Sequence, residues 1–178
     1  LAPAEQETSP FREDLSGRAL ALGHLACVRW VVGDAERALE EAIATIDLAD
    51  RIKVPILQAL AHVVRARLRY LRRDPLPIVE ADAQQAVRAA ALDLGLHTEA
   101  RAFALWAEAR RGPLALPAIQ PLLDGLRQRL NEVSTCSTLL GQVLIDVLRV
   151  SGHAAQARQL TDEIVAFAEL EEFMDLKL

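Results

Sequence analysis

The stretch Gly33-Asp34-Ala35-Glu36-Arg37-Ala38-Leu39-Glu40-Glu41-Ala42 marks a place where one helix ends and the next begins. Glycine often ends a helix because it adopts the left-handed backbone conformation without steric cost, and an aspartate after it can cap the next helix. Ala38 and Ala42 lie four residues apart and so share one face of that helix. The stretch therefore predicts a helix–turn–helix hairpin with small residues at helical spacing.

The same succession of helix end and helix start recurs along the chain at nearly constant spacing. From Gly33 to Arg73 is 40 residues, from Arg73 to Arg111 is 38, and from Gly112 to Gly152 is 40. A fixed period in this range is typical of helical-repeat arrays, in which each hairpin buries its apolar face against the next. We therefore predict an all-α fold, a right-handed α-α superhelix of about four helix-turn-helix repeats.

Apolar residues recur at helical spacing in eight segments. Pro121 cannot donate to the carbonyl four residues back, so a regular helix across both Pro117 and Pro121 is not expected. The pattern predicts helices over 16–32, 35–52, from Pro55 through Leu71, about 77–93 with Gly95 ending it, 97–111, from near Gln120 onward, from a cap at Ser134 or Thr135 to about Val150, and 154–168.

The first of these helices carries its large apolar side chains on one face, formed by Leu22, Leu25, Val28 and Val32, with Gly23 and Ala26 as small residues where another helix could approach. We divide the chain into a lead-in segment over 1–15, a repeat domain over 16–170, and the start of a further, truncated helix over 171–178. An array that ends within an element indicates a fragment of a longer protein.

Composition limits the classes of function that the chain can have. Its 178 residues are 52% hydrophobic but only 4% aromatic, and its net charge is −5. Nucleic-acid binders usually show a basic footprint, which this chain lacks overall. Residues 1–9 lack the basic and apolar regions of a signal peptide, and no apolar run reaches membrane-spanning length, so we expect a soluble, cytoplasmic protein. Cys27 and Cys136 indicate free thiols in a reducing compartment, with a disulfide as the alternative.

The hairpin motifs resemble the tetratricopeptide (TPR) type of repeat. Leu25-Ala26, Gly33-Asp34 and Ala38-Leu39 follow the consensus order of that family, as do Gly152 and Ala157, while Arg73-Asp74-Pro75 matches the turn more loosely. The segment with Pro113, Pro117 and Pro121 departs from the pattern, and the period exceeds the usual ~34 residues. Such longer repeats are similar to the C-terminal arrays of bacterial multidomain signalling ATPases and transcriptional regulators, and the resemblance implies a part in signal transduction.

In a superhelix of this kind, the first helix of each pair lines a concave surface. Trp30, Tyr70 and Trp106 fall near the ends of three successive first helices, where large amphipathic rings suit peptide capture. We predict a partner-binding face of these residues with Arg67, Asp146 and Arg149. The alternatives are that the rings fill gaps between helices and that Asp146 and Arg149 form a local pair.

A cluster of arginines follows within the third predicted helix and its end. Arg65, Arg69, Arg72 and Arg73 share one helix face by spacing and could clamp a carboxylate or phosphate. The alternative is a solvated face, paired with acidic residues and favoured by the helix dipole.

The sequence contains no arrangement that predicts catalysis, a cofactor or a metal. His24, His62, His97 and His153 lie on four different elements without a second ligand at metal spacing. We therefore predict that the protein is not an enzyme but a protein–protein interaction or sensing module of a larger regulatory protein, which binds a partner segment or neighbouring domain. A free-standing adaptor or chaperone that captures peptide termini through the arginines is the alternative, and an effector-binding bundle or enzyme comes third. The isolated fragment is expected to associate end to end through its exposed apolar ends.

Overall fold

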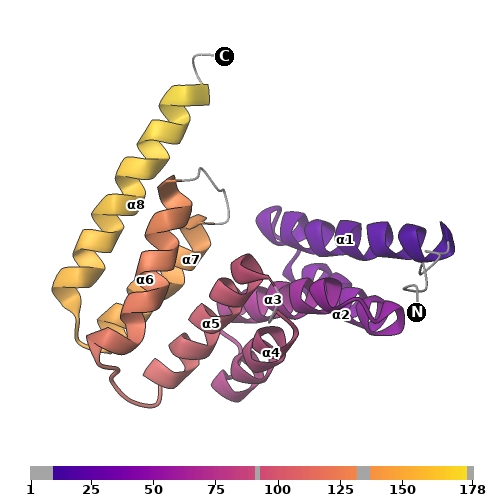
Figure 1. Cartoon of the computed structure of the whole chain (residues 1–178), viewed down its shortest axis with the longest axis horizontal. Helices are drawn as coiled ribbons and strands as arrows, with labels where there is room; N and C mark the ends of the chain where they lie inside the picture. The colour runs from indigo at the N-terminus through magenta and orange to yellow at the C-terminus, as the bar shows by residue number, and fades with distance from the viewer. Residues whose placement is uncertain (1–9, 91–92, 132–136, 176–178) are drawn as a thin grey trace, which may run out of the picture. The chain divides into compact units, whose positions relative to one another are not determined.

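The computed structural model describes residues 10–90, 93–131 and 137–175. All regular secondary structure in these ranges is helical, which confirms the prediction of an all-α fold (Figure 1). The chain divides within α5 into two compact units, Leu1–Ala100 and Arg101–Leu178. The described helices are α1 (Pro10–Val31), α2 (Ala35–Ile52), α3 (Pro55–Arg72), α4 (Leu76–Ala89), α5 (Leu94–Ala109), α6 (Leu116–Asn131), α7 (Ser137–Val150) and α8 (Ala154–Asp175).

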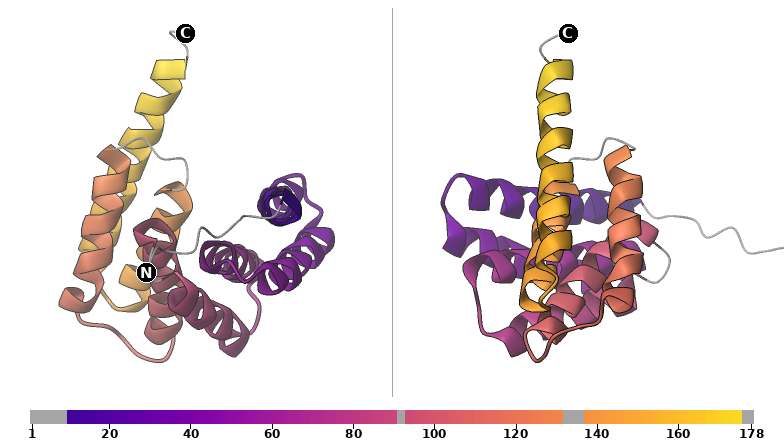
Figure 2. Two further views of the ribbon diagram at one scale, coloured as in Figure 1. Left: turned by 45° about the vertical axis from the view of Figure 1, so that its right-hand side comes forward. Right: turned by 90° about the vertical axis from the view of Figure 1, so that its left-hand side faces the viewer.

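In the first unit, helices that are neighbours in the chain are also neighbours in space (Figures 1 and 2). α1 contacts α2 and α3, α2 contacts α3, and α3 contacts α4. Small side chains at a contact allow two helix axes to lie closer together than large side chains do. The contact faces are accordingly rich in alanines that expose 0% of their surface, among them Ala38, Ala42, Ala49, Ala59 and Ala61.

The beginning of α5 belongs to this first unit. Ala100 packs with Val63 of α3 and Ala86 of α4 in one buried cluster. Asp93 caps the helix, because its carboxylate accepts a hydrogen bond from the backbone N–H of Leu96 at 2.8 Å. The first two turns of the fifth helix therefore pack against the third and fourth helices.

The second unit is built on larger aliphatic side chains. α7 contacts both α6 and α8 (Figures 1 and 2). Gly141 allows the close approach of α7 and α8, because a Cβ at this position would overlap the side chain of Ile164. Fully buried leucines fill the space between the helices, namely Leu126, Leu140, Leu144, Leu148 and Leu160.

Three hairpin turns share one backbone geometry. Gly33, Arg73 and Gly152 all have positive φ, at 90°, 60° and 83°. In the first of these turns the backbone N–H of Gly33 donates to the Trp30 carbonyl at 3.1 Å, and the backbone N–H of Asp34 donates to the Arg29 carbonyl at 2.9 Å. The turns at Arg73 and Gly152 repeat both bonds at the same offsets. This is the Schellman motif, which satisfies carbonyls at a helix end, and Asp34 caps α2 as predicted.

The turn after α5 is different. Arg111 and Gly112 both donate to the carbonyl of Glu108, and Gly112 is not among the described residues with positive φ. The following loop is held by the α7–α8 turn instead. The Leu114 N–H donates to the Ser151 hydroxyl at 3.1 Å, and the His153 Nε2 lies 2.8 Å from the Leu114 carbonyl. The chain at Arg111-Gly112 therefore follows the end of a helix, but it does not form the turn that occurs at Gly33, Arg73 and Gly152.

The expectation that the sixth helix starts cleanly only near Gln120 was wrong, since α6 begins at Leu116 and contains both prolines. Pro117 lies in the first turn, where a backbone N–H has no helical partner in any case. Pro121 removes a single bond, the one to the Pro117 carbonyl. The loss of one hydrogen bond is smaller than the gain from burying Ile119 and Leu123.

Three other boundaries also differ from the sequence prediction. Gly95 lies inside α5 and does not end the fourth helix, which stops at Ala89. Residues 171–175 continue α8 instead of starting a further helix, and α1 begins at Pro10 rather than at residue 16. The caps predicted at Ser134 or Thr135 lie outside the described residues.

Candidate functional site

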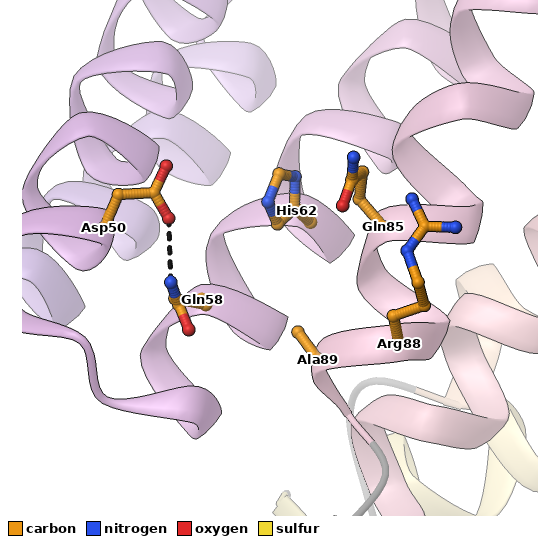
Figure 3. Close-up of a pocket in the computed structure, with 6 residues that line it drawn as sticks. All are labelled: Asp50, Gln58, His62, Gln85, Arg88 and Ala89. Atoms are coloured by element: carbon orange, nitrogen blue, oxygen red, sulfur yellow. Dashed lines mark hydrogen bonds between the residues drawn. The ribbon is translucent and has the colours of Figure 1, made fainter.

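A polar pocket of about 370 Å³ lies in the first unit, among α2, α3 and α4 (Figure 3). The late part of α2 contributes Asp50, the first half of α3 contributes Gln58 and His62, and the end of α4 contributes Gln85 and Arg88. All five side chains carry hydrogen-bonding groups. The sequence analysis did not predict this pocket, because its residues come from three helices and form no local motif.

His62 is the central group of the pocket and is half-buried. Burial lowers the pKa of His62, the nearby Arg65 lowers it further, and the carboxylates of Asp82 and Asp50 oppose the shift. The imidazole is therefore neutral near pH 7. Its Nδ1 is buried without a hydrogen-bond partner. Because a buried lone pair is tolerated better than a buried N–H, we assign the proton to Nε2.

The walls of the pocket carry opposite charges. Gln58 donates a hydrogen bond of 2.9 Å from Nε2 to Oδ1 of Asp50, which orients this carboxylate (Figure 3). Arg88 forms no ion pair within the part of the chain that the structure describes. In Figure 3, Asp50 and Arg88 lie on opposite sides of His62. The pocket thus offers an acceptor end and a donor end to one ligand.

Three of the four predicted anion-binding arginines contact carboxylates of the chain itself. Arg65 and Arg69 both pair with Asp82 of α4, the latter with 2.9 Å between Nη1 and Oδ2. Arg72 lies 3.4 Å from Asp74, and Arg73 is exposed in the hairpin turn. Binding of an external anion by these four arginines stays a prediction.

Asp82 could have been found from the sequence. It is only 2% exposed, and it stands three residues after Val79 and four before Ala86, on the apolar face of α4. A carboxylate at such a position needs a cationic partner, because an unpaired buried charge is very unfavourable. The arginines one helix earlier, at Arg65 and Arg69, supply it.

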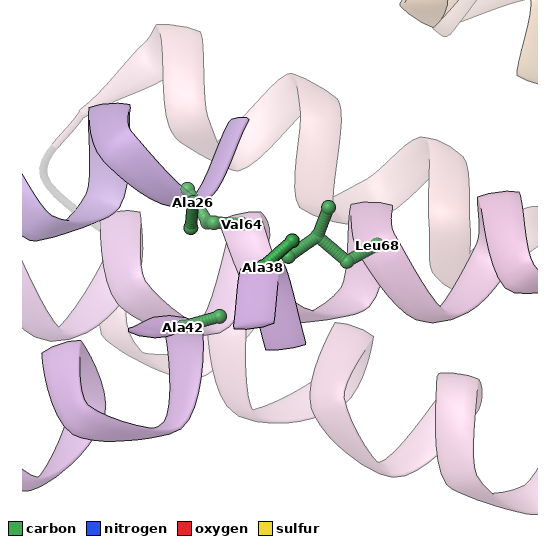
Figure 4. Close-up of a cluster of buried hydrophobic side chains, with 5 residues drawn as sticks. All are labelled: Ala26, Ala38, Ala42, Val64 and Leu68. Atoms are coloured by element: carbon green, nitrogen blue, oxygen red, sulfur yellow. The ribbon is translucent and has the colours of Figure 1, made fainter. Parts of the chain in front are cut away.

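The three residues predicted for the concave face that lie in the first unit are engaged in internal contacts. Trp30 packs against a buried cluster. Figure 4 shows the five residues of this cluster, Ala26, Ala38, Ala42, Val64 and Leu68. Tyr70 is buried. Arg67 donates from Nε to Glu99 at 3.0 Å and from Nη1 to the Cys27 thiol at 3.5 Å. These contacts agree with the alternative that the rings fill gaps between helices.

The other three predicted residues lie in the second unit. Trp106 is half-buried, with the Arg110 guanidinium 6.0 Å from its ring centroid. Asp146 is half-buried and Arg149 is exposed at the end of α7. Since the six residues are divided between two units, their grouping on one partner-binding face stays a prediction. Cys27 is a free thiol, and Cys136 lies outside the described residues.

The prediction that another helix approaches the first one at Gly23 and Ala26 is confirmed, but Leu25, Val28 and Val32 on its apolar face are not buried. These side chains are exposed, whereas Ala19, Gly23 and Ala26 face the unit's interior. A Cβ on Gly23 would be 3.9 Å from both Leu60 and Thr45, so the small residues bring α1 onto α2 and α3. The result is an apolar surface of side chains between 39% and 82% exposed, formed by Leu20, Leu25, Val28 and Val31 of α1 and by Val32 directly after it.

Among the described residues, no helix combines the length and apolarity needed to cross a bilayer. Within the same ranges, no three or more His, Cys, Asp or Glu side chains come together as metal ligands. Comparison with protein-family profiles, with curated proteins and with solved structures found no match.

Proposed function

We propose that this chain is a non-catalytic protein-interaction module whose hairpins stack as TPR-like repeats, and that it serves a larger bacterial regulatory protein. The shared geometry of the turns at Gly33, Arg73 and Gly152 supports the repeat architecture. The acidic net charge of −5 favours a protein partner over nucleic acid. The partner is a protein segment or a neighbouring domain.

The observation that carries this proposal is the apolar surface of α1. Val28, Val31 and Val32 expose 56%, 82% and 72% of their surface. Exposed aliphatic residues that share one helix face mark interaction surfaces, because leaving them in water is unfavourable. The groove expected around Trp30 and Tyr70 is a weaker candidate, since both rings already pack inside the unit.

The ligand that fits this surface is an amphipathic helix. Leu25, Val28 and Val32 follow one another at spacings of three and four residues, the pattern that packs along a second helix. α3 contacts helices on more than one side, whereas α1 packs within the unit through Gly23 and Ala26 together with Leu22 and Trp30, and leaves its valines exposed. In a solution of the purified chain, α1 of a second copy supplies the docking helix in a symmetric, antiparallel pair.

Sedimentation velocity over a range of protein concentrations tests the proposal. The wild type is expected to form a dimer as the concentration rises. Val28→Lys places a charge at the centre of the surface and should abolish the dimer. Lysine is chosen because a cation in the last turn of a helix does not oppose the helix dipole.

Val165→Lys is the matched control. Val165 is 52% exposed, also on a helix, but it lies on α8 in the other unit. This variant should dimerise like the wild type, and far-UV circular dichroism should show equal helix content in all three proteins. A wild type that stays monomeric, or a Val28→Lys variant that dimerises normally, would contradict the proposed surface.

The adaptor alternative, capture of peptide termini by the arginine cluster, has less support. It needs guanidinium groups that are open to a ligand. Arg65 and Arg69 contact the buried Asp82, and Arg67 contacts Glu99. A peptide carboxylate would have to displace these internal carboxylates. The internal carboxylates have the advantage, because they belong to the same chain and lose no translational or rotational freedom when they pair with the arginines.

A further inference from the structure

We propose that the pocket among α2, α3 and α4 binds a small zwitterion that carries a carboxylate and an ammonium group, such as the backbone of an amino acid or short peptide. This inference does not depend on the surface of α1. It rests on the arrangement of Asp50, His62 and Arg88 around one space of about 370 Å³ (Figure 3).

The donor end of the pocket favours a carboxylate. Arg88 presents a guanidinium that can form two parallel hydrogen bonds with a carboxylate, and it has no ion pair within the described part of the chain. The neutral His62, protonated on Nε2, offers one further N–H. The amide of Gln85 lines the same side and can donate as well.

The acceptor end favours an ammonium group. Asp50 is exposed, and only its Oδ1 is bonded to Gln58, so Oδ2 can accept from a ligand. The Gln58 side chain donates its Nε2 to Asp50 and leaves its own Oε1 as a second acceptor. An ammonium carries three donors, which these two oxygens can share.

The balance of charges argues against the two simpler ligands. A phosphate dianion would meet one guanidinium, a neutral imidazole and the repulsion of Asp50, whereas phosphate sites usually gather several donors or cations. A metal cation would find a single carboxylate and the repulsion of Arg88. A ligand with one positive and one negative group is complementary to both walls of the pocket. This complementarity indicates that the ligand is a zwitterion.

The test titrates the full chain with three probes and follows backbone amide signals by NMR. The probes are alanyl-alanine, its N-acetylated form without the ammonium, and its C-terminal amide without the carboxylate. Alanyl-alanine should shift the amides around Asp50, His62 and Arg88. Each blocked form should bind about tenfold more weakly, since each loses one charge-assisted hydrogen-bonded contact.

Two variants assign each end of the ligand. In Arg88→Gln, alanyl-alanine should bind about as weakly as its amide does to the wild type, and removal of the carboxylate should cost nothing more. In Asp50→Asn, alanyl-alanine should bind about as weakly as its N-acetylated form binds to the wild type, and removal of the ammonium should cost nothing more. Asp47→Asn, one turn earlier on the exposed side of α2, and Arg37→Gln, near the start of that helix, are the matched controls and should bind like the wild type.

Three results would overturn the inference. The first is that none of the probes shifts the pocket amides at concentrations up to about 20 mM, a range that would detect even very weak binding. The second is that the blocked dipeptides bind as well as alanyl-alanine. The third is that inorganic phosphate binds more tightly than alanyl-alanine and is lost with Arg88→Gln, which would make the pocket an anion site. Val28→Lys should leave dipeptide binding unchanged, which separates this inference from the proposed function.

Discussion

At the scale of single residues, the first unit is distinguished by the charges it buries. Asp82 lies on the apolar face of α4 and is paired with Arg65 and Arg69. Glu99 on α5 is also buried and is paired with Arg67. All three ion pairs join α3 to a later helix, so they select which helices pack together as well as neutralise the charges.

Replacement of Asp82 by alanine should lower the free energy of unfolding by about 2–4 kcal/mol, because it leaves two largely buried guanidinium groups without their carboxylate. Denaturant unfolding followed by circular dichroism measures the loss. Asp124→Ala is the control, since Asp124 is 63% exposed and lies 3.9 Å from Arg127. That exposed pair should contribute less than about 1 kcal/mol. Equal losses in the two variants would show that the buried network does not stabilise the fold.

His62 should make the stability of the protein depend on pH. Burial lowers the pKa of His62 in the folded protein below its ordinary value of 6.5, so the unfolded chain binds this proton more strongly. The stabilising contribution is complete above pH 6.5 and is lost as the pH falls through 6.5 towards the folded pKa. His62→Gln should therefore show a smaller decrease in unfolding free energy than the wild type between about pH 7.5 and about pH 5. Parallel urea titrations that gave identical pH profiles would contradict this.

At the scale of secondary-structure elements, the hairpin turn is the unit that recurs. The turns at Gly33, Arg73 and Gly152 make the same two backbone hydrogen bonds around a residue of positive φ. Glycine adopts this conformation freely, whereas a residue with a Cβ does so at a cost of about 1–2 kcal/mol. Arg73 is therefore the strained member of the series.

Arg73→Gly should raise the free energy of unfolding by about 0.5–1 kcal/mol, since it relieves the strain but gives the unfolded chain more freedom. Arg72→Gly, one position earlier and still in α3, is the control and should lower it by about 0.5–1 kcal/mol. A rise in the free energy of unfolding for Arg73→Gly and a fall for Arg72→Gly would identify the turn geometry as the cause of the difference. A loss of stability in both variants would argue against the equivalence of the turns.

At the scale of the whole molecule, the chain comprises two compact units that use different packing. The first joins its helices largely through alanines, and the second through buried leucines. The boundary at Ala100 falls inside α5, where the apolar periodicity continues without a break. The sequence therefore contains no signal for this boundary.

The proposed pairing of α1 surfaces has a consequence for the unfolding of the molecule. If two folded copies associate and the unfolded chains do not, mass action stabilises the folded state as the concentration rises. The thermal midpoint of the wild type should therefore increase over a hundredfold range of concentration. That of Val28→Lys should stay constant, as measured by differential scanning fluorimetry with intrinsic tryptophan. Equal behaviour of the two proteins would count against the dimer.

The sequence by itself determined the helical class of the described residues and the hairpin turns at Gly33, Arg73 and Gly152. Those features depend on signals within a few residues, such as the cap at Asp34, the left-handed residue at Gly33 and apolar residues at helical spacing. The prediction around Pro121 was wrong because it considered the one lost backbone hydrogen bond and not the burial of apolar side chains that offsets this loss.

Only the tertiary structure decided which faces pack and which side chains meet. The first helix buries Gly23 and Ala26 and exposes Val28 and Val32, because close approach of backbones makes more contacts than a looser interface of valines. The pairing of Arg65 with Asp82, and the pocket around His62, join residues from different helices. Such contacts depend on how the helices are placed in space, and local sequence patterns do not encode that placement.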